Sequence, residues 1–411
     1  MKKINFIYSF LILAFATGGM NVRAQEKQAY ILKNGEVVFQ SNISDIDSMV
    51  FTTDPRPATP EPFNDLTASQ IVDNIRVGWN LGNTLDATDF GAGWLPYTAS
   101  IVQMETSWGN PVTTQATIDA VKKAGFNTIR IPVTWSKVID ADYNIRADWM
   151  ARVTEIVNYA VANDMYILLN THHDEGIFKF TEAEKAESFK AFQKIWAQIA
   201  YNFRNYNEKL IFEGLNEPRT KGSPNEWNGG TAEERNILNE HYQLFVNTVR
   251  ASGGNNDKRI LMVNTYAASG THIAMDDLKI PTDPTPNKII VSIHVYAPYD
   301  FAMNTSSPIT TWSQSNSNDT FPITDPMNYA SNQFVSKGIP VIWGEFGAIN
   351  KNNEPARAIW AKYYVSYAFN KGMKCVWWDD GGDYKILNRS NNTFLYPQIV
   401  DALMQGTGGG L

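Results

Sequence analysis

The sequence predicts an α/β protein whose main part is a TIM (β/α)8 barrel, preceded by a short N-terminal β-hairpin segment and a proline-rich linker. Three observations predict it: eight short apolar runs, amphipathic stretches between most of them, and glycines that end a helix just before a strand, as at Gly125, Gly338 and Gly372. Continuous apolar character is typical of strands buried on both faces of a parallel sheet. A doubly wound open sheet is the alternative, but no Gly-x-Gly-x-x-Gly segment follows the first strand, which lowers that option.

The elements follow from periodicity and from start and stop signals. The expected strands span residues 75–81, 128–133, 166–170, 210–215, 259–263, 289–295, 341–344 and 375–378. The expected helices span residues 115–124, 149–162, 181–203, 232–251, 326–336 and 355–370. Thr181 begins one of these helices with an acid in the first turn, which is an N-cap pattern. Eight such units between residues 64 and 405 fit a TIM barrel with long loops.

The N-terminus has the pattern of an export signal. Lys2 and Lys3 precede the apolar stretch 4–16, and the small residue Ala24 ends a cleavage-type sequence. The apolar stretch is too short to span a bilayer as a helix. We therefore expect residues 1–24 to be a signal peptide. Because no cysteine follows the apolar stretch, we expect a secreted protein, periplasmic or extracellular, without a lipid anchor.

The segments that flank the barrel carry no visible chemistry. Residues 25–53 contain two β-prone runs around Asn34 and Gly35, and Asn-Gly is a strong hairpin signal. Prolines spaced through residues 54–63 predict an extended linker. We expect the catalytic domain to span 64–405 and residues 406–411 to form a frayed tail.

Composition narrows the class of partner. The net charge of −7 argues against binding nucleic acid or an anionic membrane, which needs a basic face. A small or neutral ligand fits better, and a monomer is the default. The 12 tryptophans and 18 tyrosines belong either to the core or to a cleft for sugar rings. Cys375 is the single cysteine, so disulfides within the chain and thiolate metal clusters are excluded.

Polar residues stand at the ends of most of the predicted strands. In a TIM barrel such residues point into the mouth where catalysis takes place. They are Asn80, Asn83, Arg130, His172, His173, Asn216, Glu217, His294, Tyr296, Glu345, Trp378, Asp379 and Asp380.

Two of these residues are glutamates, and glycosidic cleavage needs two carboxyl groups. One protonates the leaving oxygen, and the other attacks the sugar or activates water. Arg130 would hold a neighbouring carboxylate ionised, as a nucleophile requires. Glu217, flanked by Asn216 and Pro218 rather than by a cation, could keep its proton near neutral pH. The Asn216 amide can bond a sugar 2-hydroxyl.

Several motifs of this chain resemble glycoside hydrolase family 5, the cellulase family. The family motifs are Leu215-Asn216-Glu217-Pro218 and Gly344-Glu345-Phe346-Gly347. Three further segments, at residues 79–86, 105–111 and 127–135, resemble subfamily 4 of endoglucanases and xyloglucanases. The resemblance runs in order from about residue 66 to about residue 404.

The resemblance implies a retaining mechanism with Glu217 as acid/base and Glu345 as nucleophile. It further implies that five residues surround the reacting sugar: Arg130, His172, Asn216, His294 and Tyr296. Trp378 is expected as a stacking floor. His173, Asn83, Trp135 and Trp108 are expected as substrate contacts, although the last two could instead plug the barrel top. Asp380 stands where the family usually has Asn, which leaves one subsite contact uncertain, and Thr171 replaces a more typical Leu.

Other interpretations stay open from the sequence. Arg130 could pair with a buried acid for stability alone, and His294 could be a core histidine. His172 and His173, with Asp174 and Glu175 after them, could hold a metal ion, which would make the protein a metal-dependent hydrolase. A carbohydrate-binding barrel without catalysis is a further alternative, although both carboxylates are present.

The leading prediction is a secreted retaining endo-β-1,4-glucanase that uses no cofactor and no metal. Its partner would be a β-glucan polysaccharide: cellulose, xyloglucan or a mixed-linkage glucan. A xyloglucan-specific endoglucanase, a mixed-linkage glucanase and a xylanase with the same machinery are the alternatives.

Overall fold

The computed structural model describes residues 28–33, 36–43, 54–87 and 95–409, and the predicted signal peptide lies outside these residues. The chain divides into two compact units, Met1–Asp54 and Pro55–Leu411. In the first unit, β1 (Gln28–Lys33) and β2 (Glu36–Asn42) pair antiparallel, with Tyr30 opposite Gln40. This confirms the predicted hairpin, whose Asn-Gly turn lies outside the described residues.

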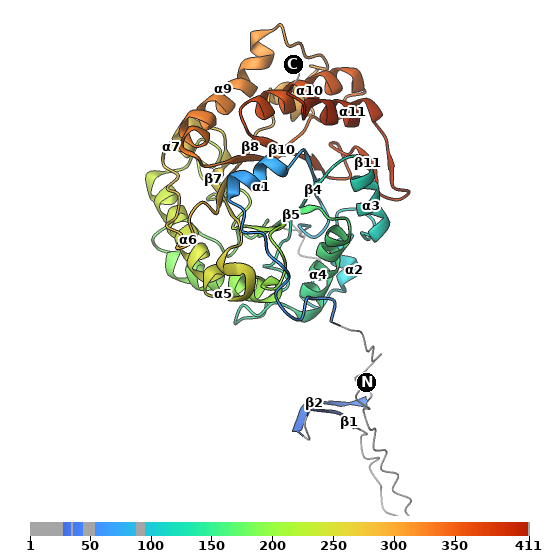
Figure 1. The fold of residues 1–411 in the computed structure, drawn as a ribbon, viewed down its shortest axis with the longest axis vertical. Helices are drawn as coiled ribbons and strands as arrows, with labels where there is room; N and C mark the ends of the chain where they lie inside the picture. The colour runs from blue at the N-terminus through green and yellow to red at the C-terminus, as the bar shows by residue number, and fades with distance from the viewer. Residues whose placement is uncertain (1–27, 34–35, 44–53, 88–94, 410–411) are drawn as a thin grey trace, which may run out of the picture. The chain divides into compact units, whose positions relative to one another are not determined.

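The second unit is a closed barrel of eight parallel strands (Figure 1). The strands are β3 (Gly78–Leu81), β4 (Thr128–Ile131), β5 (Tyr166–Asn170), β6 (Leu210–Glu213), β7 (Leu261–Ser269), β8 (Ile289–His294), β9 (Val341–Phe346) and β10 (Lys374–Asp379). β10 pairs with β3 and so closes the cylinder. Almost every strand residue is buried, as the continuous apolar runs predict. The TIM barrel is confirmed.

Helices cover the barrel, most of them in a ring around it and α1 across one of its ends (Figure 1). They are α1 (Ala68–Asn74), α2 (Ile101–Glu105), α3 (Gln115–Lys123), α4 (Ala147–Ala162), α5 (Lys185–Phe203), α6 (Ala232–Arg250), α7 (His272–Asp276), α8 (Tyr299–Ala302), α9 (Ser317–Gln333), α10 (Glu354–Asn370) and α11 (Pro397–Gly406). Short 3-10 turns, Gly254–Asp257 and Val335–Lys337, and the small β11–β12 pair (Leu387–Asn388, Thr393–Phe394) complete the unit. None of the described helices is both long and apolar enough to cross a membrane.

The barrel interior is plugged at the end where the strands begin. α1 directly precedes β3, and its Ile71 and Val72 pack in one cluster with Leu168, Ile211 and Val376 from the strands. The Thr67 side chain caps α1 by accepting from the Gln70 N–H. Because this end is filled with apolar side chains, an active site can form only at the opposite end.

Several predicted boundaries differ from the structure. The predicted helix 326–336 is wrong at its start, because α9 begins at Ser317 and contains Pro322 and Pro326. A proline is common at the first position of a helix, so the prediction began this helix at Pro326, which is too late. The predicted helix 181–203 begins only at Lys185, after a turn. The predicted strand 259–263 is extended through a register shift to Ser269. Short helices such as α2, α7 and α8 were not predicted, because they are too short to show a helical periodicity of apolar residues.

The proline-spaced run 54–63 contains no helix and no strand in the structure. From Pro55 on it is part of the barrel unit, where Arg56 donates to the Asn202 side chain at 2.8 Å and the Pro57 carbonyl accepts from Asn205 at 2.8 Å. At the other end of the unit, α11 includes Gly406, the first residue of the expected tail.

Arg259 joins the end of α5 to the start of β6. It is fully buried, and its five N–H groups donate to the Asn256 side chain and to the carbonyls of Phe203, Tyr206, Asn207 and Leu210, at 2.5–3.1 Å. Burial, and then the charge of Arg250, lowers the pKa of Arg259 to about 9, so the group is still cationic at neutral pH. One buried cation therefore satisfies four carbonyls that lie between the last residue of α5 and the first residue of β6.

We expect Arg259→Met to lower the free energy of unfolding by at least about 3 kcal/mol, since hydrogen bonds to a charged group are each worth roughly 1.5–3 kcal/mol. Thermal and urea unfolding would measure the loss. Arg204→Met is the control, because Arg204 is partly exposed and donates to the Tyr201 carbonyl near the surface. Equal stability of the two variants would contradict the role given to Arg259.

Candidate functional site

The predicted site residues meet at the end of the barrel where the strands finish. Arg130 lies in β4, Glu345 in β9 and Trp378 in β10, whereas Glu217 follows β6 by four residues. His172 and His173 follow β5, and His294 is the last residue of β8. Parallel strands bring these positions together although they are far apart in the sequence.

Arg130 donates hydrogen bonds to four side chains of this site. Its Nη1 donates to Glu345 Oε1 at 2.7 Å and to Asn80 Oδ1 at 3.0 Å. Its Nη2 donates to Asn216 Oδ1 at 2.7 Å, and its Nε donates to Glu213 Oε2 at 2.6 Å. Burial alone would lower the pKa of Arg130, but the charges of Glu213 and Glu345 raise it. The guanidinium therefore stays charged and fixes four side chains from three parts of the barrel.

Glu213 was missed by the sequence interpretation. It is fully buried and also accepts from the amides of Asn170 (3.1 Å) and Asn264 (2.9 Å). The signal was available, because Glu213 lies two residues after the inward-facing Ile211 and an alternating strand points both to the same side. Arg130 does pair with a buried acid, Glu213, but it also contacts Glu345, so stability is not the only part that its position allows.

The two candidate catalytic carboxylates face each other. One oxygen of Glu217, one of Glu345 and one nitrogen of His294 all lie within 4.8 Å of one another. Nδ1 of His294 is 3.1 Å from Glu217 Oε1 and 3.7 Å from Glu345 Oε1, so this imidazole bridges the pair rather than serving the core alone.

Tyr296 holds the second oxygen of Glu345. Its hydroxyl donates to Glu345 Oε2 at 2.9 Å. Burial, and then the charge of Glu345, raises the pKa of Tyr296 well above its usual range, so the phenol keeps its proton. With Arg130 on Oε1 and Tyr296 on Oε2, both oxygens of Glu345 are bonded and its orientation is fixed.

The expectation that no cation lies near Glu217 is wrong. Arg219 Nη1 is 3.6 Å from Glu217 Oε2, although only Pro218 separates the two residues in the sequence. Burial would raise the pKa of Glu217, but the hydrogen bond from His294 and the charges of His294, Arg219 and His173 outweigh it and lower that pKa. In this structure Glu217 is therefore held toward its ionised form.

The alternative of a metal site at His172 is disfavoured by the tautomer of that residue. Asn170 is locked, because its Oδ1 accepts from the Val133 N–H at 3.1 Å while its Nδ2 donates to Glu213. That same Nδ2 lies 3.1 Å from His172 Nδ1, which must therefore accept. Burial keeps the pKa of His172 well below its usual range, so the ring is neutral and its proton is on Nε2. Binding a metal ion through Nε2 would therefore require the other tautomer and the loss of the hydrogen bond from Asn170, although ligand atoms of Asp86, His172 and His173 lie within 4.8 Å of one another.

His172 Nε2 instead serves as a donor that points into the mouth. It lies 4.0 Å from Glu345 Oε1 and 4.0 Å from Asp86 Oδ2. The Asp86 carboxylate is already bonded, because it accepts from the N–H groups of Asn83 (3.0 Å) and Thr84 (2.7 Å). Asp86 was not predicted from the sequence as a site residue, and its part is to shape the loop after β3.

Four of the five expected substrate contacts lie at the mouth. The Trp378 ring is parallel to the His172 ring, with centroids 5.8 Å apart. Trp108 is partly exposed, with its centroid 5.7 Å from that of His173. Asn83 is partly buried and has a positive φ of 54°.

Trp135 corrects the expectation made for it. It has no exposed surface, and its Nε1 donates to the Asn170 carbonyl at 3.0 Å. It therefore supports the strand end that carries Asn170 and makes no contact with a ligand in this conformation. The alternative that it plugs the barrel top fits the structure.

The two departures from the family pattern are accommodated locally. Asp380 Oδ1 accepts from the N–H groups of Gly382 (2.7 Å) and Tyr384 (3.0 Å), and burial raises the pKa of this carboxyl. Thr171 is buried, and its hydroxyl donates to the Gly214 carbonyl at 2.8 Å. Both residues thus shape loops next to the mouth.

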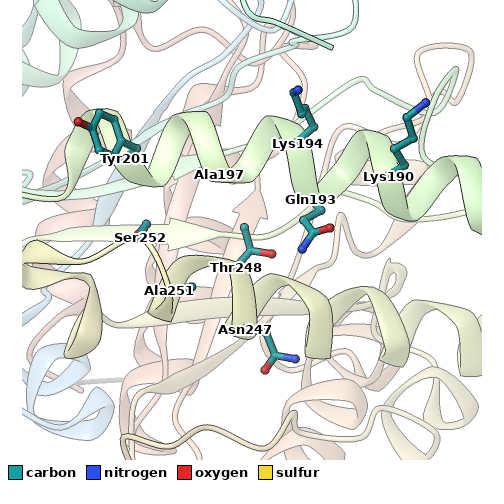
Figure 2. Close-up of a pocket in the computed structure, with 9 residues that line it drawn as sticks. All are labelled: Lys190, Gln193, Lys194, Ala197, Tyr201, Asn247, Thr248, Ala251 and Ser252. Carbon is teal, nitrogen blue, oxygen red and sulfur yellow. The ribbon is translucent and has the colours of Figure 1, made fainter. Parts of the chain in front are cut away.

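A second hollow lies on the outer wall between α5 and α6 (Figure 2). Figure 2 shows Gln193 and Thr248 directed toward each other across it, while Lys190 and Lys194 point away from α6. The nine residues that line it include no carboxylate and no histidine, so it offers no acid–base pair.

The comparisons with known proteins agree with this geometry. A family model described as "Cellulase (glycosyl hydrolase family 5)" matches residues 86–383. Endoglucanase A of Ruminococcus albus is 43% identical over 352 residues, which cover 83% of this chain and 93% of that protein. Endoglucanase A of Clostridium longisporum is 44% identical over 83% of this chain, which spans 66% of that longer protein.

Solved structures are similar as well. A GH5-4 broad specificity endoglucanase from Ruminococcus champanellensis with bound cellotriose has a TM-score of 0.80 and 46% identity, covering 84% of this chain and 100% of that one. A mutant glycoside hydrolase 5 lichenase from Caldicellulosiruptor sp. F32, in complex with cellotetraose, has a TM-score of 0.78 and 39% identity, covering 86% and 98%.

The locked tautomer gives a direct test of the metal alternative. Calorimetric titration with Zn²⁺ should show the same heat for the wild type and for the His172→Ala, His173→Ala double variant, because His172 offers no lone pair at Nε2. Stoichiometric Zn²⁺ uptake that the double variant loses would contradict this assignment.

Proposed function

The chain belongs to glycoside hydrolase family 5, the cellulase family, and on that premise we propose that it is a secreted retaining endo-β-1,4-glucanase. The observation that carries the proposal is the pair Glu217 and Glu345, whose oxygens lie within 4.8 Å across the barrel mouth with different partners. Retaining enzymes place their carboxyl groups about 5–5.5 Å apart, whereas inverting enzymes leave roughly 6.5–9.5 Å for a water molecule. The short separation supports retention.

In the proposed first step, Glu345 attacks the anomeric carbon of the sugar. Arg130 and Tyr296 hold its two oxygens at 2.7 and 2.9 Å, so the carboxylate is oriented for the attack. The bond from the anomeric carbon to the leaving oxygen breaks while a bond to the Glu345 oxygen forms. Glu217 gives its proton to the leaving oxygen, and the reducing-end part of the chain departs.

In the proposed second step, Glu217 acts as a base. Now ionised, it accepts a proton from water, whose oxygen attacks the anomeric carbon and releases Glu345. The groups that lower the pKa of Glu217 in the free site, His294 first and then Arg219 and His173, favour this ionised form. Two inversions at the same carbon return the original β configuration.

Arg130 also orients a contact that matters for the rate. Because Asn216 Oδ1 accepts from Arg130 at 2.7 Å, the Asn216 amide N–H groups turn away from the guanidinium. They can then donate to the sugar 2-hydroxyl, a bond that strengthens in the oxocarbenium-like transition state.

The substrate and the location follow from separate arguments. Relatives with bound cellotriose and cellotetraose support a chain of β-linked glucose as substrate. The lichenase relative favours mixed-linkage β-glucan as a second candidate. The positively charged start and apolar stretch of residues 1–24 support secretion, which suits a polymer too large to enter a cell.

We expect Glu345→Gln to lower kcat roughly 10⁴–10⁶-fold on carboxymethylcellulose, barley glucan and xyloglucan alike, because the nucleophile is lost. Reducing-end assays would measure the loss, and the melting temperature should show that the fold is intact. Glu182→Gln, the same change at an exposed surface position, is the control and should keep full activity. Normal turnover by Glu345→Gln would remove the nucleophile assignment.

Glu217→Ala should affect polymer and activated substrates unequally. We expect about a 10²–10⁴-fold loss on polymer, where the leaving sugar needs a proton. The step that cleaves a dinitrophenyl cellobioside should be much less affected, because that leaving group departs without protonation. Equal losses in this step for both substrates would exclude Glu217 as the acid.

A further inference from the structure

A second arginine lies beside the proposed acid/base, and it does not contact the reacting carboxylate Glu345. Arg219 is buried, and its Nη1 is 3.6 Å from Glu217 Oε2 and donates to the Glu217 carbonyl at 2.8 Å. The same guanidinium contacts two further carboxylates, Glu175 at 3.2 Å and Glu226 at 2.9 Å. One cation is thus shared among three acids.

We propose that Arg219 is a positioning residue that divides its charge among Glu217, Glu175 and Glu226, and by this division sets the pH range in which Glu217 can act as an acid. The inference rests on the proposed acid/base role of Glu217 and goes beyond it, since it assigns the tuning of that role to three residues outside the reacting pair.

The contrast with Arg130 carries the argument. Arg130 bonds Glu345 directly at 2.7 Å, so the charge of this guanidinium lies in direct contact with the proposed nucleophile. Arg219 stands further from the Glu217 carboxylate, at 3.6 Å, and makes its shorter side-chain contacts to Glu226 and Glu175. An acid/base residue must be both protonated and ionised in one cycle. A weak, shared cation permits this, whereas a direct bond like that of Arg130 would oppose protonation.

The Arg219 guanidinium is held in place. Glu226, which anchors its Nε, is itself fixed by the Gly222 N–H at 2.7 Å. The Arg219 Cζ lies 4.4 Å from the centre of the Trp227 ring, at cation–π distance. Contacts from Glu226, Glu175, Trp227 and the Glu217 carbonyl therefore restrain its distance from the Glu217 carboxylate.

The other groups that face Glu217 come from three strands. His294 of β8 is 3.1 Å from Oε1, Glu345 of β9 lies within 4.8 Å, and His173 after β5 adds positive charge. Tyr296 also interacts with Glu217 but keeps its proton. His173 Nδ1 lies 3.7 Å from Glu175 Oε1, which links it to the same cluster. Arg219 is the group of this set whose positive charge does not depend on pH in the working range.

The sign of the effect follows from the first step. Glu217 must be protonated there, so kcat/KM falls as the pH rises through the pKa of Glu217 in the free enzyme. Removing the Arg219 charge raises this pKa. The alkaline limb of the pH profile of kcat/KM then moves to higher pH. Neutralising Glu226 leaves more of the Arg219 charge for Glu217 and moves the same limb to lower pH.

The test is the pH profile of kcat/KM on a soluble β-glucan for Arg219→Gln, Arg219→Lys and Glu226→Gln. We expect Arg219→Gln to move the alkaline limb up by on the order of one pH unit, since an opposite charge at this distance shifts a carboxyl by about 1–3 units. Glu226→Gln should move it down. Arg219→Lys keeps the charge and should leave the limb close to that of the wild type.

Controls separate tuning from structure. Arg250→Gln breaks a similarly buried ion pair with Asp283, at 2.5 Å, away from the site, and should lower the melting temperature without moving the limb. If Arg219→Gln does not fold, the profile of Glu226→Gln still tests the inference, because its alkaline limb is expected to move to lower pH. The inference is overturned if the alkaline limb of kcat/KM stays in place in these variants. It is also overturned if the limb moves in the same direction in Arg219→Gln and Glu226→Gln.

The failure of this inference is distinguishable from failure of the proposed function. If Glu217→Ala loses polymer and dinitrophenyl activity equally, the acid role itself is wrong. If Glu217→Ala shows the unequal loss while the limbs do not move, Glu217 remains the acid and only the tuning by Arg219 is rejected.

Discussion

The site depends on one buried cation. Arg130 has no exposed surface, and a guanidinium taken out of water is stable only when its donors are matched by acceptors and its charge by an acid. Glu213 of β6 forms one ion pair with Arg130, and Glu345 of β9 forms a second. Arg130 also bonds Asn80 and Asn216, so one planar guanidinium group sets the positions of these side chains relative to one another. The proposed nucleophile, Glu345, is therefore held in place by a side chain of the barrel wall.

Two carboxylates of one chemical kind acquire different properties through their neighbours. Glu345 is bonded on both oxygens, by Arg130 and Tyr296, whereas Glu217 is bonded on one oxygen by His294 and approached on the other by Arg219. A fully bonded carboxylate is suited to remain an ion, and a partly bonded one can exchange a proton. This asymmetry, rather than the presence of two glutamates, is what double displacement requires.

The loops of the mouth are held by buried polar groups at the seam of the barrel. Asp379, at the end of β10, accepts from the Trp79 indole at 3.1 Å and from the N–H groups of Ile386 and Leu387. Arg389 donates to Asp379 at 3.0 Å and to the Gly82 carbonyl at 2.9 Å, and so ties the loop after β10 to the loop after β3. These bonds join the first and last strands of the barrel on the side where Trp378 lies.

The eight-stranded barrel, and the end of it at which the site lies, could be predicted from local patterns in the amino-acid sequence. Apolar runs are local, and parallel strands must carry their final polar residues to a common edge, so Arg130, Glu217 and Glu345 could be grouped without coordinates. Only the tertiary structure decided which group touches which. Arg219 bends back toward Glu217, and Trp135 turns into the core, because loop direction and side-chain packing depend on contacts between segments that no local period encodes.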